Sequence, residues 1–204
     1  MNLANKFTFV RIIFTLIIIF ILLFPFYQIN IEFPKYMINN LIIIDLKYII
    51  AGILFVLAAF TDFLDGYIAR KYNMVTDFGK FMDQIADKIL VNSVLIILAA
   101  SNHISAIIPV LIIMRDTVVS SIRMITASKG KVIPAGIAGK IKTACLMIGI
   151  TLILFSNLPF ELWNIKVADV LLIVATVLSL ISAVQYYLIN REYISQKVEK
   201  VKII

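Results

Sequence analysis

Four aspartates with helical spacing mark residues 61–88 as the part of the chain best suited to chemistry. Asp62 and Asp65 are three residues apart. Asp83 and Asp87 are four apart. Each spacing places two carboxylates on one face of a helix. Long apolar runs flank the stretch, and carboxylates in such surroundings are unfavourable unless a cation meets them. The identity of that cation decides what the stretch does.

Two kinds of cation could meet these acids. Basic residues nearby could form ion pairs at a helix–loop boundary, namely Arg70, Lys80 and Lys88. They could neutralise one or two carboxylates, but hardly a converging set of four. A divalent metal is the better partner, because Mg²⁺ and Mn²⁺ take oxygen ligands and two carboxylate pairs can hold one or two ions. Such a metal keeps positions for water and substrate phosphate, which indicates phosphoryl transfer.

Residues between the two acid pairs indicate a diphosphate or nucleotide site. Gly66 and Ala69 have almost no side chain, and a glycine inside a helix needs a packing or ligand reason. The gap would let a flat base or a diphosphate approach the backbone. Arg70 follows with forked donors suited to phosphate. Thr76 and Gly79 lie where the chain must turn into the next helix.

The elements that must position these residues are membrane helices. The chain has 204 residues, is 62% hydrophobic, and has a mean hydropathy of +1.02. Six apolar segments are long enough to span a bilayer, at about 20 residues each. The sequence predicts an all-α, polytopic integral membrane protein with six transmembrane helices in one domain, 1–204. We place the helices near 9–26, 48–70, 83–101, 105–126, 135–156 and 167–189.

Basic residues predict the orientation in the membrane. The formal charge is +7, and Lys and Arg concentrate in the N-terminus, in the loops after the second and fourth spans, and in the tail. Excess Lys and Arg marks the cytoplasmic side, so both termini and the aspartates should face the cytoplasm. The first apolar run is expected to stay as a helix of a cell-membrane protein. The 27–47 connection should lie on the outer surface. The protein as a whole is expected to have the lipid bilayer as its partner, and no nucleic acid.

The acids and the small residues between them carry a resemblance to a known family. The pattern fixes eight residues between positions 62 and 87 and matches the signature of the CDP-alcohol phosphotransferases position for position. The six-span layout is also that family's, so the resemblance covers essentially the whole chain. The matching residues are Asp62, Asp65, Gly66, Ala69, Arg70, Gly79, Asp83 and Asp87.

This resemblance implies a reaction and a role for each residue. Family members displace CMP from a CDP-linked lipid, and the acceptor hydroxyl attacks the β-phosphate. Asp62, Asp65 and Asp83 would bind the metals, two ions per subunit, while Asp87 would contribute a ligand and act as general base. The resemblance also suggests a homodimer. The CDP pocket would be shaped by Asp62, Gly66, Ala69, Arg70, Thr76 and Gly79.

Substrate choice has to come from outside this pattern. The N-terminal run resembles that of bacterial phosphatidylglycerophosphate synthases, a branch of the family. In that comparison Asn5 and Thr8 would approach the cytidine nucleotide, although each could equally be an ordinary polar residue at a helix start. Ala4, Gln84, Asp116 and Ser121 depart from the usual residues of this branch, and none of them removes a proposed ligand.

A group of basic residues in the fourth and fifth spans indicates the acceptor. Arg115 and Arg123 are eight residues apart, so they lie roughly on one face of a helix, and Lys140 and Lys142 open the next helix. These four residues would bind a phosphate on the acceptor, which favours glycerol 3-phosphate as co-substrate of CDP-diacylglycerol. A local ion pair between Arg115 and Asp116 is the alternative.

Three other functions stay open at this point. The same chemistry could use phosphatidylglycerol, serine or inositol phosphate as acceptor. Membrane prenyltransferases also hold Mg²⁺-diphosphate with aspartate clusters, but they lack the set of Gly66, Ala69, Arg70 and Gly79. A divalent-ion transporter would suit paired carboxylates in a membrane, although its site would be expected nearer the midplane.

Overall fold

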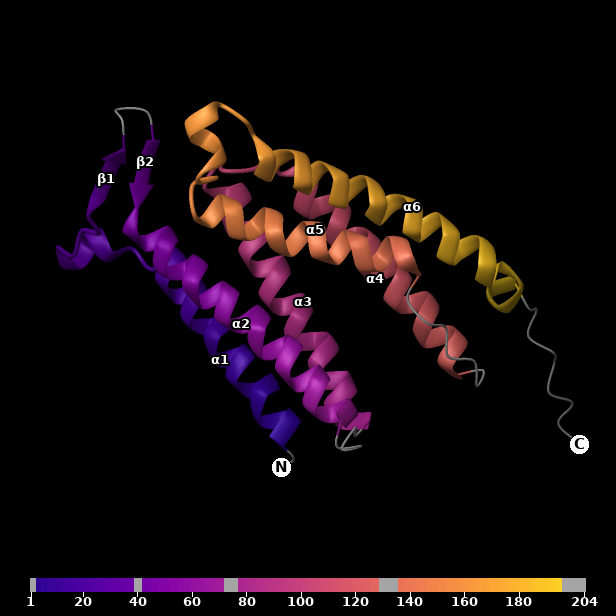
Figure 1. Cartoon of the computed structure of the whole chain (residues 1–204). Coiled ribbons are helices and arrows are strands. Elements are labelled where there is room, and N and C mark those ends of the chain that lie inside the picture. The colour runs from indigo at the N-terminus through magenta and orange to yellow at the C-terminus, as the bar shows by residue number, and fades with distance from the viewer. Residues whose placement is uncertain (1–2, 39–41, 72–76, 129–135, 196–204) are drawn as a thin grey trace, which may run out of the picture.

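Six α-helices dominate the structure, a computed structural model that describes residues 3–38, 42–71, 77–128 and 136–195 (Figure 1). The predicted helical class is confirmed, and each helix begins and ends within six residues of its predicted span. Short 3₁₀ turns at Phe26–Ile29 and Phe160–Trp163 interrupt two of the connections. The helices are α1 (Leu3–Leu23), α2 (Leu46–Lys71), α3 (Asp77–Ala100), α4 (Ile107–Ser128), α5 (Ile137–Leu154) and α6 (Val167–Ser195).

Four of the helices are long and apolar enough to cross a membrane by length and composition. The other two, α3 and α4, carry more charged residues in their apolar segments. The structure therefore supports a helical membrane protein, while the full count of six spans stays a prediction. The four qualifying segments are Lys6–Leu23, Leu46–Leu64, Ile137–Leu154 and Val167–Arg191.

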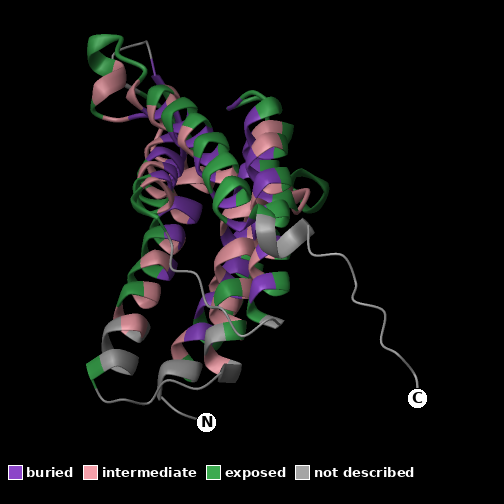
Figure 2. Ribbon diagram, turned by 90° about the vertical axis from the view of Figure 1, so that its right-hand side faces the viewer, coloured by how far each residue is buried: buried purple, intermediate pink, exposed green. Residues whose placement is uncertain are grey.

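The helices pack in two groups of three (Figure 1). Helix α1 packs along both α2 and α3, and these two helices each pack more extensively on α1 than on one another. Helix α6 packs along α5 and α4 in the same way. The groups meet where α2 contacts α5 and where α3 contacts α4. Figure 2 shows buried residues on the faces that the helices turn toward one another and exposed residues on their outer faces.

The buried face of α1 changes from polar to apolar along the helix. Its buried residues recur every three or four positions, as expected for one face of a helix packed on two neighbours. The polar members come first, so the first half of α1 brings polar groups between α2 and α3. The buried residues are Thr8, Arg11, Thr15, Ile18 and Leu22.

The connection between α1 and α2 contains a small β-hairpin, which the sequence analysis did not predict. Strands β1 (Lys35–Ile38) and β2 (Ile42–Asp45) pair antiparallel, with Lys35 opposite Asp45. The β-branched run in β2 suits this structure, because Ile42 and Ile44 are buried on one face. The hairpin lies at the opposite end of α2 from the aspartates (Figure 1).

Candidate active site

Three of the four predicted acids come together between α2 and α3. Asp62 lies on α2, and Asp83 and Asp87 lie one turn apart on α3. One carboxylate oxygen from each lies within 4.8 Å of the other two. Their side chains are 34%, 40% and 44% exposed, so the cluster is accessible from one side. The predicted spacing within α3 is thus confirmed as a shared face, and α2 supplies the third acid.

The cation that meets these acids is Arg11 of α1. Its Nη2 lies 2.8 Å from Asp62 Oδ1, and its Nη1 donates to Asp83 Oδ1 at 2.7 Å and to Asp87 Oδ1 at 2.8 Å. The Arg11 side chain has no exposed surface. One guanidinium therefore ties together carboxylates from two helices, and it does so from the buried side of the cluster.

Sequence reasoning missed this role of Arg11. It considered Arg70, Lys80 and Lys88 as ion-pair partners, but Lys88 donates to Ser120 of α4. The side chains of Arg70 and Lys80 lie outside the described residues. The available signal was the position of Arg11 within an apolar run, because an arginine in such a run needs an anionic partner.

The donor set fits a divalent metal. Three carboxylates offer oxygen atoms close enough to share one ion, and oxygen donors without sulfur or nitrogen suit Mg²⁺ or Mn²⁺. The exposed side of the acids leaves room for ligands that the protein does not supply. The fourth predicted ligand is Asp65, whose backbone belongs to α2 and whose side chain lies outside the described residues, so its role stays a prediction.

The residues predicted to shape the CDP pocket lie around the same cluster where the structure describes them. Thr8 is buried on α1, one turn before Arg11. Gly66 is one turn beyond Asp62 in α2, and Gly79 is one turn before Asp83 in α3. The role of these three residues in a CDP pocket stays a prediction. The side chains of Asn5, Ala69 and Arg70, and the whole of Thr76, lie outside the described residues.

A second charged cluster lies between α4, α5 and α6. Asp116 of α4 accepts hydrogen bonds from Arg115 Nη1 at 2.7 Å and from Lys142 Nζ at 2.7 and 2.9 Å. The Arg115 guanidinium also donates to the Ser179 backbone carbonyl at 2.9 Å and to the Ser182 hydroxyl of α6. The local ion pair that the sequence left open is therefore formed, and Arg115 in addition ties α4 to α6.

The other two predicted acceptor residues, Arg123 and Lys140, make no described contact with Arg115 or Lys142. Arg123 Nη2 donates to the Tyr186 hydroxyl at 2.7 Å, and its Cζ lies 5.0 Å from the centre of the Tyr186 ring. Its Nε is buried without a hydrogen-bond partner among the described residues. Lys140 is exposed, and it points away from the buried Lys142 because two residues differ by about 200° around a helix.

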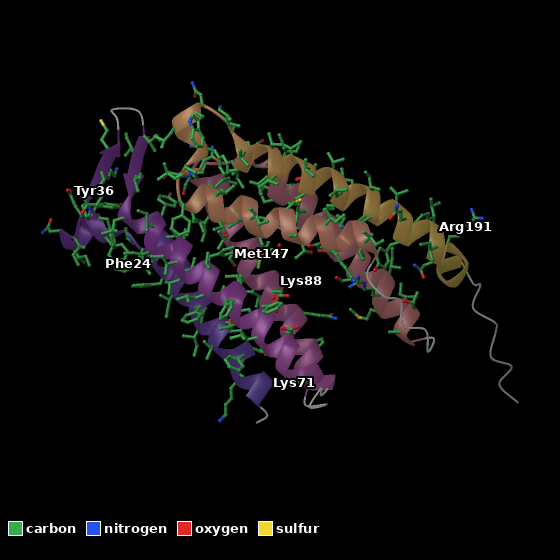
Figure 3. The ribbon with its side chains drawn as sticks, viewed as in Figure 1. Phe24, Tyr36, Lys71, Lys88, Met147 and Arg191 are labelled. Carbon is green, nitrogen blue, oxygen red and sulfur yellow. The ribbon has the colours of Figure 1, made fainter. Side chains whose placement is uncertain are left out.

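The two clusters are joined through α3 and α4. Lys88, the residue after Asp87, lies on α3 (Figure 3), and its Nζ donates to Ser120 Oγ. Ser120 Oγ donates in turn to the backbone carbonyl of Asp116 at 2.6 Å. Lys88 is also near enough to act electrostatically on Lys142. The carboxylate of Asp116 thus pairs with two cations, Arg115 and Lys142, and Lys88 is linked to the Asp116 backbone through Ser120.

A cavity of about 360 Å³ lies at the hairpin end of the protein, away from both clusters. Lys35 and Asp45 of the hairpin line it, together with Tyr48 and His103. The rings of Tyr48 and His103 pack with their centres 4.5 Å apart. One acid does not make a metal site, so the aspartates between α2 and α3 define the candidate active site.

The fold and the site together define a helical membrane protein. It has a cluster of three acids that could bind a metal and, linked to it through α3, a mainly basic cluster between α4, α5 and α6. The family model for CDP-alcohol phosphatidyltransferases matches residues 1–181. The chain belongs to this family and is an enzyme of the phosphatidyltransferase class. The resemblance seen in the aspartate motif is therefore confirmed.

Similar bacterial proteins carry one name, CDP-diacylglycerol–glycerol-3-phosphate 3-phosphatidyltransferase. The protein from Bacillus subtilis is 39% identical over 191 residues, which are 94% of this chain and 96% of that protein. The protein from Rickettsia felis is 33% identical over 193 residues, 94% of this chain and 97% of its own. The protein from Rickettsia bellii is 36% identical over 149 residues, 72% and 82% of the two chains.

The charge balance around Asp116 generates a first prediction. Asp116→Asn should lower the free energy of unfolding by about 3–5 kcal/mol, because it leaves Arg115 and Lys142 buried beside a neutral amide. Unfolding of the purified protein in lipid nanodiscs would measure the change. Asp169→Asn, in the first turn of α6, is the matched control and should change stability by less than about 1 kcal/mol. Equal effects of the two substitutions would contradict the structural role of Asp116.

Proposed function

We propose that the protein transfers the phosphatidyl group of CDP-diacylglycerol to glycerol 3-phosphate, giving phosphatidylglycerol phosphate and CMP. The observation that carries this proposal is the connection of the two clusters through Lys88 and Ser120. The acids of α2 and α3 suit a diphosphate with its metal, and the basic network that begins at Lys88 suits a phosphate on the acceptor. The shared name of the similar bacterial proteins supports the same choice.

At the acids, Asp62, Asp65, Asp83 and Asp87 would hold Mg²⁺ or Mn²⁺, two ions per subunit. The metal supplies charge neutralisation on the transferring phosphoryl group. Asp87 also accepts the proton of the attacking hydroxyl, for which its half-exposed carboxylate is accessible. The acceptor oxygen forms a new bond to the β-phosphorus of CDP-diacylglycerol. The bond from that phosphorus to the oxygen of the CMP phosphate breaks, and CMP leaves with the bonding electrons.

The CDP-lipid would lie against the ends of α1, α2 and α3 that surround the acids. Thr8 and Gly66 border the cluster from α1 and α2, and Gly79 borders it from α3. Small residues on α2 let the nucleotide approach the helix backbone. The remaining residues proposed for this pocket are Asn5, Asp62, Ala69, Arg70 and Thr76.

The acceptor phosphate would bind to the basic network. Arg115 and Lys142 pair with the single carboxylate of Asp116, and Lys88 acts electrostatically on Lys142, so the network carries more positive than negative charge among the described residues. A buried excess of positive charge favours an anion. Arg123 stacks on Tyr186 and forms no described ion pair, so its fork can reach a phosphate. Each of the three guanidinium nitrogens of Arg115 donates to a group of the protein, so Arg115 would position the network and not bind the phosphate directly. Lys140 would act at the exposed edge of the network.

The setting of this reaction is also part of the proposal. Both termini and the active site would face the cytoplasm, where glycerol 3-phosphate and the released CMP are soluble. This orientation follows from the excess of Lys and Arg in the connections on that side. The protein would act in the cell membrane as a homodimer, an assembly that only the family resemblance suggests.

An acceptor panel tests the proposed function. The purified protein would be offered CDP-diacylglycerol with glycerol 3-phosphate, serine, inositol phosphate or phosphatidylglycerol, with and without Mg²⁺. We expect CMP release with glycerol 3-phosphate and Mg²⁺ and only background release with the other acceptors. CMP formed with another acceptor alone would reassign the substrate. Metal flux across liposomes, with no CMP formed from any acceptor, would favour a transporter instead.

The proposed base role of Asp87 gives a separate prediction. Asp87→Asn should lower the rate of CMP release by about 10²–10⁴-fold, because the amide cannot accept the proton of the attacking hydroxyl. Binding of CDP-diacylglycerol, measured with a radiolabelled lipid, should change little. The control is Asp45→Asn in the hairpin, at the other end of the protein. Near-normal turnover in Asp87→Asn would remove Asp87 from the base role.

The proposed acceptor site predicts a selective effect on one substrate. Arg123→Ala should raise the KM for glycerol 3-phosphate by about 10–100-fold, which corresponds to the loss of one hydrogen bond between charged groups. The KM for CDP-diacylglycerol should stay nearly constant. Steady-state kinetics with each substrate varied in turn would measure both. Tyr186→Phe removes the hydroxyl that accepts from Arg123 and should give a smaller shift in the same direction. An effect confined to CDP-diacylglycerol would contradict the acceptor role.

A further inference from the structure

The contacts of Arg11 are unusual for a metal site. Its guanidinium is fully buried, and it reaches the same three carboxylates that form the candidate metal cluster. Asp62, Asp83 and Asp87 meet it with one oxygen each, at 2.7–2.8 Å. Helix α1, which carries Arg11, packs along both helices that supply these acids. The guanidinium of Arg11 therefore binds the three carboxylates from the buried side of the cluster.

In this position the charge of Arg11 attracts the carboxylates and would repel a metal ion bound to them. Three carboxylates so close together repel one another, and a guanidinium, which stays protonated in proteins, offsets that repulsion. A divalent ion that binds the exposed side of the same carboxylates is repelled by the guanidinium. The effect is reciprocal. The charge of Arg11 weakens metal binding by a certain free energy, and the bound metal weakens the ion pairs of Arg11 by the same free energy.

We propose that Arg11 is an internal counter-cation that holds the acids in place in the metal-free protein and weakens the binding of the metal. The acids then keep their arrangement between catalytic cycles, and the metal stays exchangeable. Tight metal binding in this case depends on the further ligands that a diphosphate brings. This inference rests on the proposed metal site and is independent of which acceptor the enzyme uses.

Substitution of Arg11 separates its charge from its hydrogen-bonding shape. Mn²⁺ is the probe, and its binding to the full-length protein in phosphatidylcholine nanodiscs is followed by electron paramagnetic resonance without substrate. Arg11→Gln removes the charge and should tighten Mn²⁺ binding by about tenfold or more. Arg11→Lys keeps the charge and should stay within about threefold of the unaltered protein. Arg191→Gln, an exposed arginine near the end of α6 (Figure 3), is the control and should bind Mn²⁺ normally.

Thermal unfolding in the same nanodiscs gives an independent measurement. Arg11→Gln and Arg11→Lys should both lower the Tm in the presence of a chelator, because neither side chain can bridge three carboxylates. With saturating Mn²⁺ the loss of Tm should shrink for Arg11→Gln, because that variant binds Mn²⁺ more tightly and gains more stability from it. The loss should stay nearly constant for Arg11→Lys, which binds Mn²⁺ much as the unaltered protein does. If Arg11→Gln does not fold, Arg11→Met, which also lacks the charge, takes its place in both measurements.

The outcomes distinguish this inference from the metal site on which it rests. Unchanged or weaker Mn²⁺ binding in Arg11→Gln would overturn the inference, and so would a loss of Tm in that variant that is equal with and without Mn²⁺. Asp83→Asn removes a proposed ligand and should weaken Mn²⁺ binding at least tenfold. Equal binding by Asp83→Asn and the unaltered protein would instead remove the metal site itself, and the inference with it.

Discussion

The arrangement of the site depends on one buried charge, the guanidinium of Arg11. A charge with no exposed surface is stable only when it is fully paired, and here the partners come from two other helices. This pairing fixes both the axial position of α1 and its rotation about its axis relative to α2 and α3. A shift of one residue would turn the guanidinium away from the acids. The acids need the same contact, since α2 and α3 pack more extensively on α1 than on each other.

The same rule, with the signs reversed, organises the second group of helices. There one carboxylate, Asp116, holds Arg115 and Lys142, and Arg115 extends the contact to α6. Both clusters lie on or beside α3 and α4, the two helices that are too charged to qualify as membrane spans by composition. The two helices that are least suited to lipid thus contact each other where the groups meet, beside the contact of the more apolar α2 and α5.

The sequence predicts local features of the site, but it does not predict which helices pack against one another. Periodicity and hydropathy placed all six helices, and the spacing of four put Asp83 and Asp87 on one face. No local rule identifies which helix packs against that face, so the pairing with Arg11 was not predicted. Lys140 and Lys142 were grouped by proximity in sequence, although a spacing of two places them on different faces. The hairpin was missed because an isoleucine run between apolar helices has no strand-specific period.

The arrangement of α3 also bears on substrate choice under the proposed function. Asp87 and Lys88 are consecutive residues, so they point about 100° apart around the helix. The first faces the acids and Arg11, and the second faces Ser120 and the basic network. One turn of one helix thus presents a carboxylate and an ammonium group to neighbouring regions. A short acceptor with a hydroxyl at one end and a phosphate at the other could reach both regions, whereas serine would offer the basic network a carboxylate with an ammonium beside it in place of a phosphate. Under the proposed function, the helix that carries the base would also help to select the acceptor.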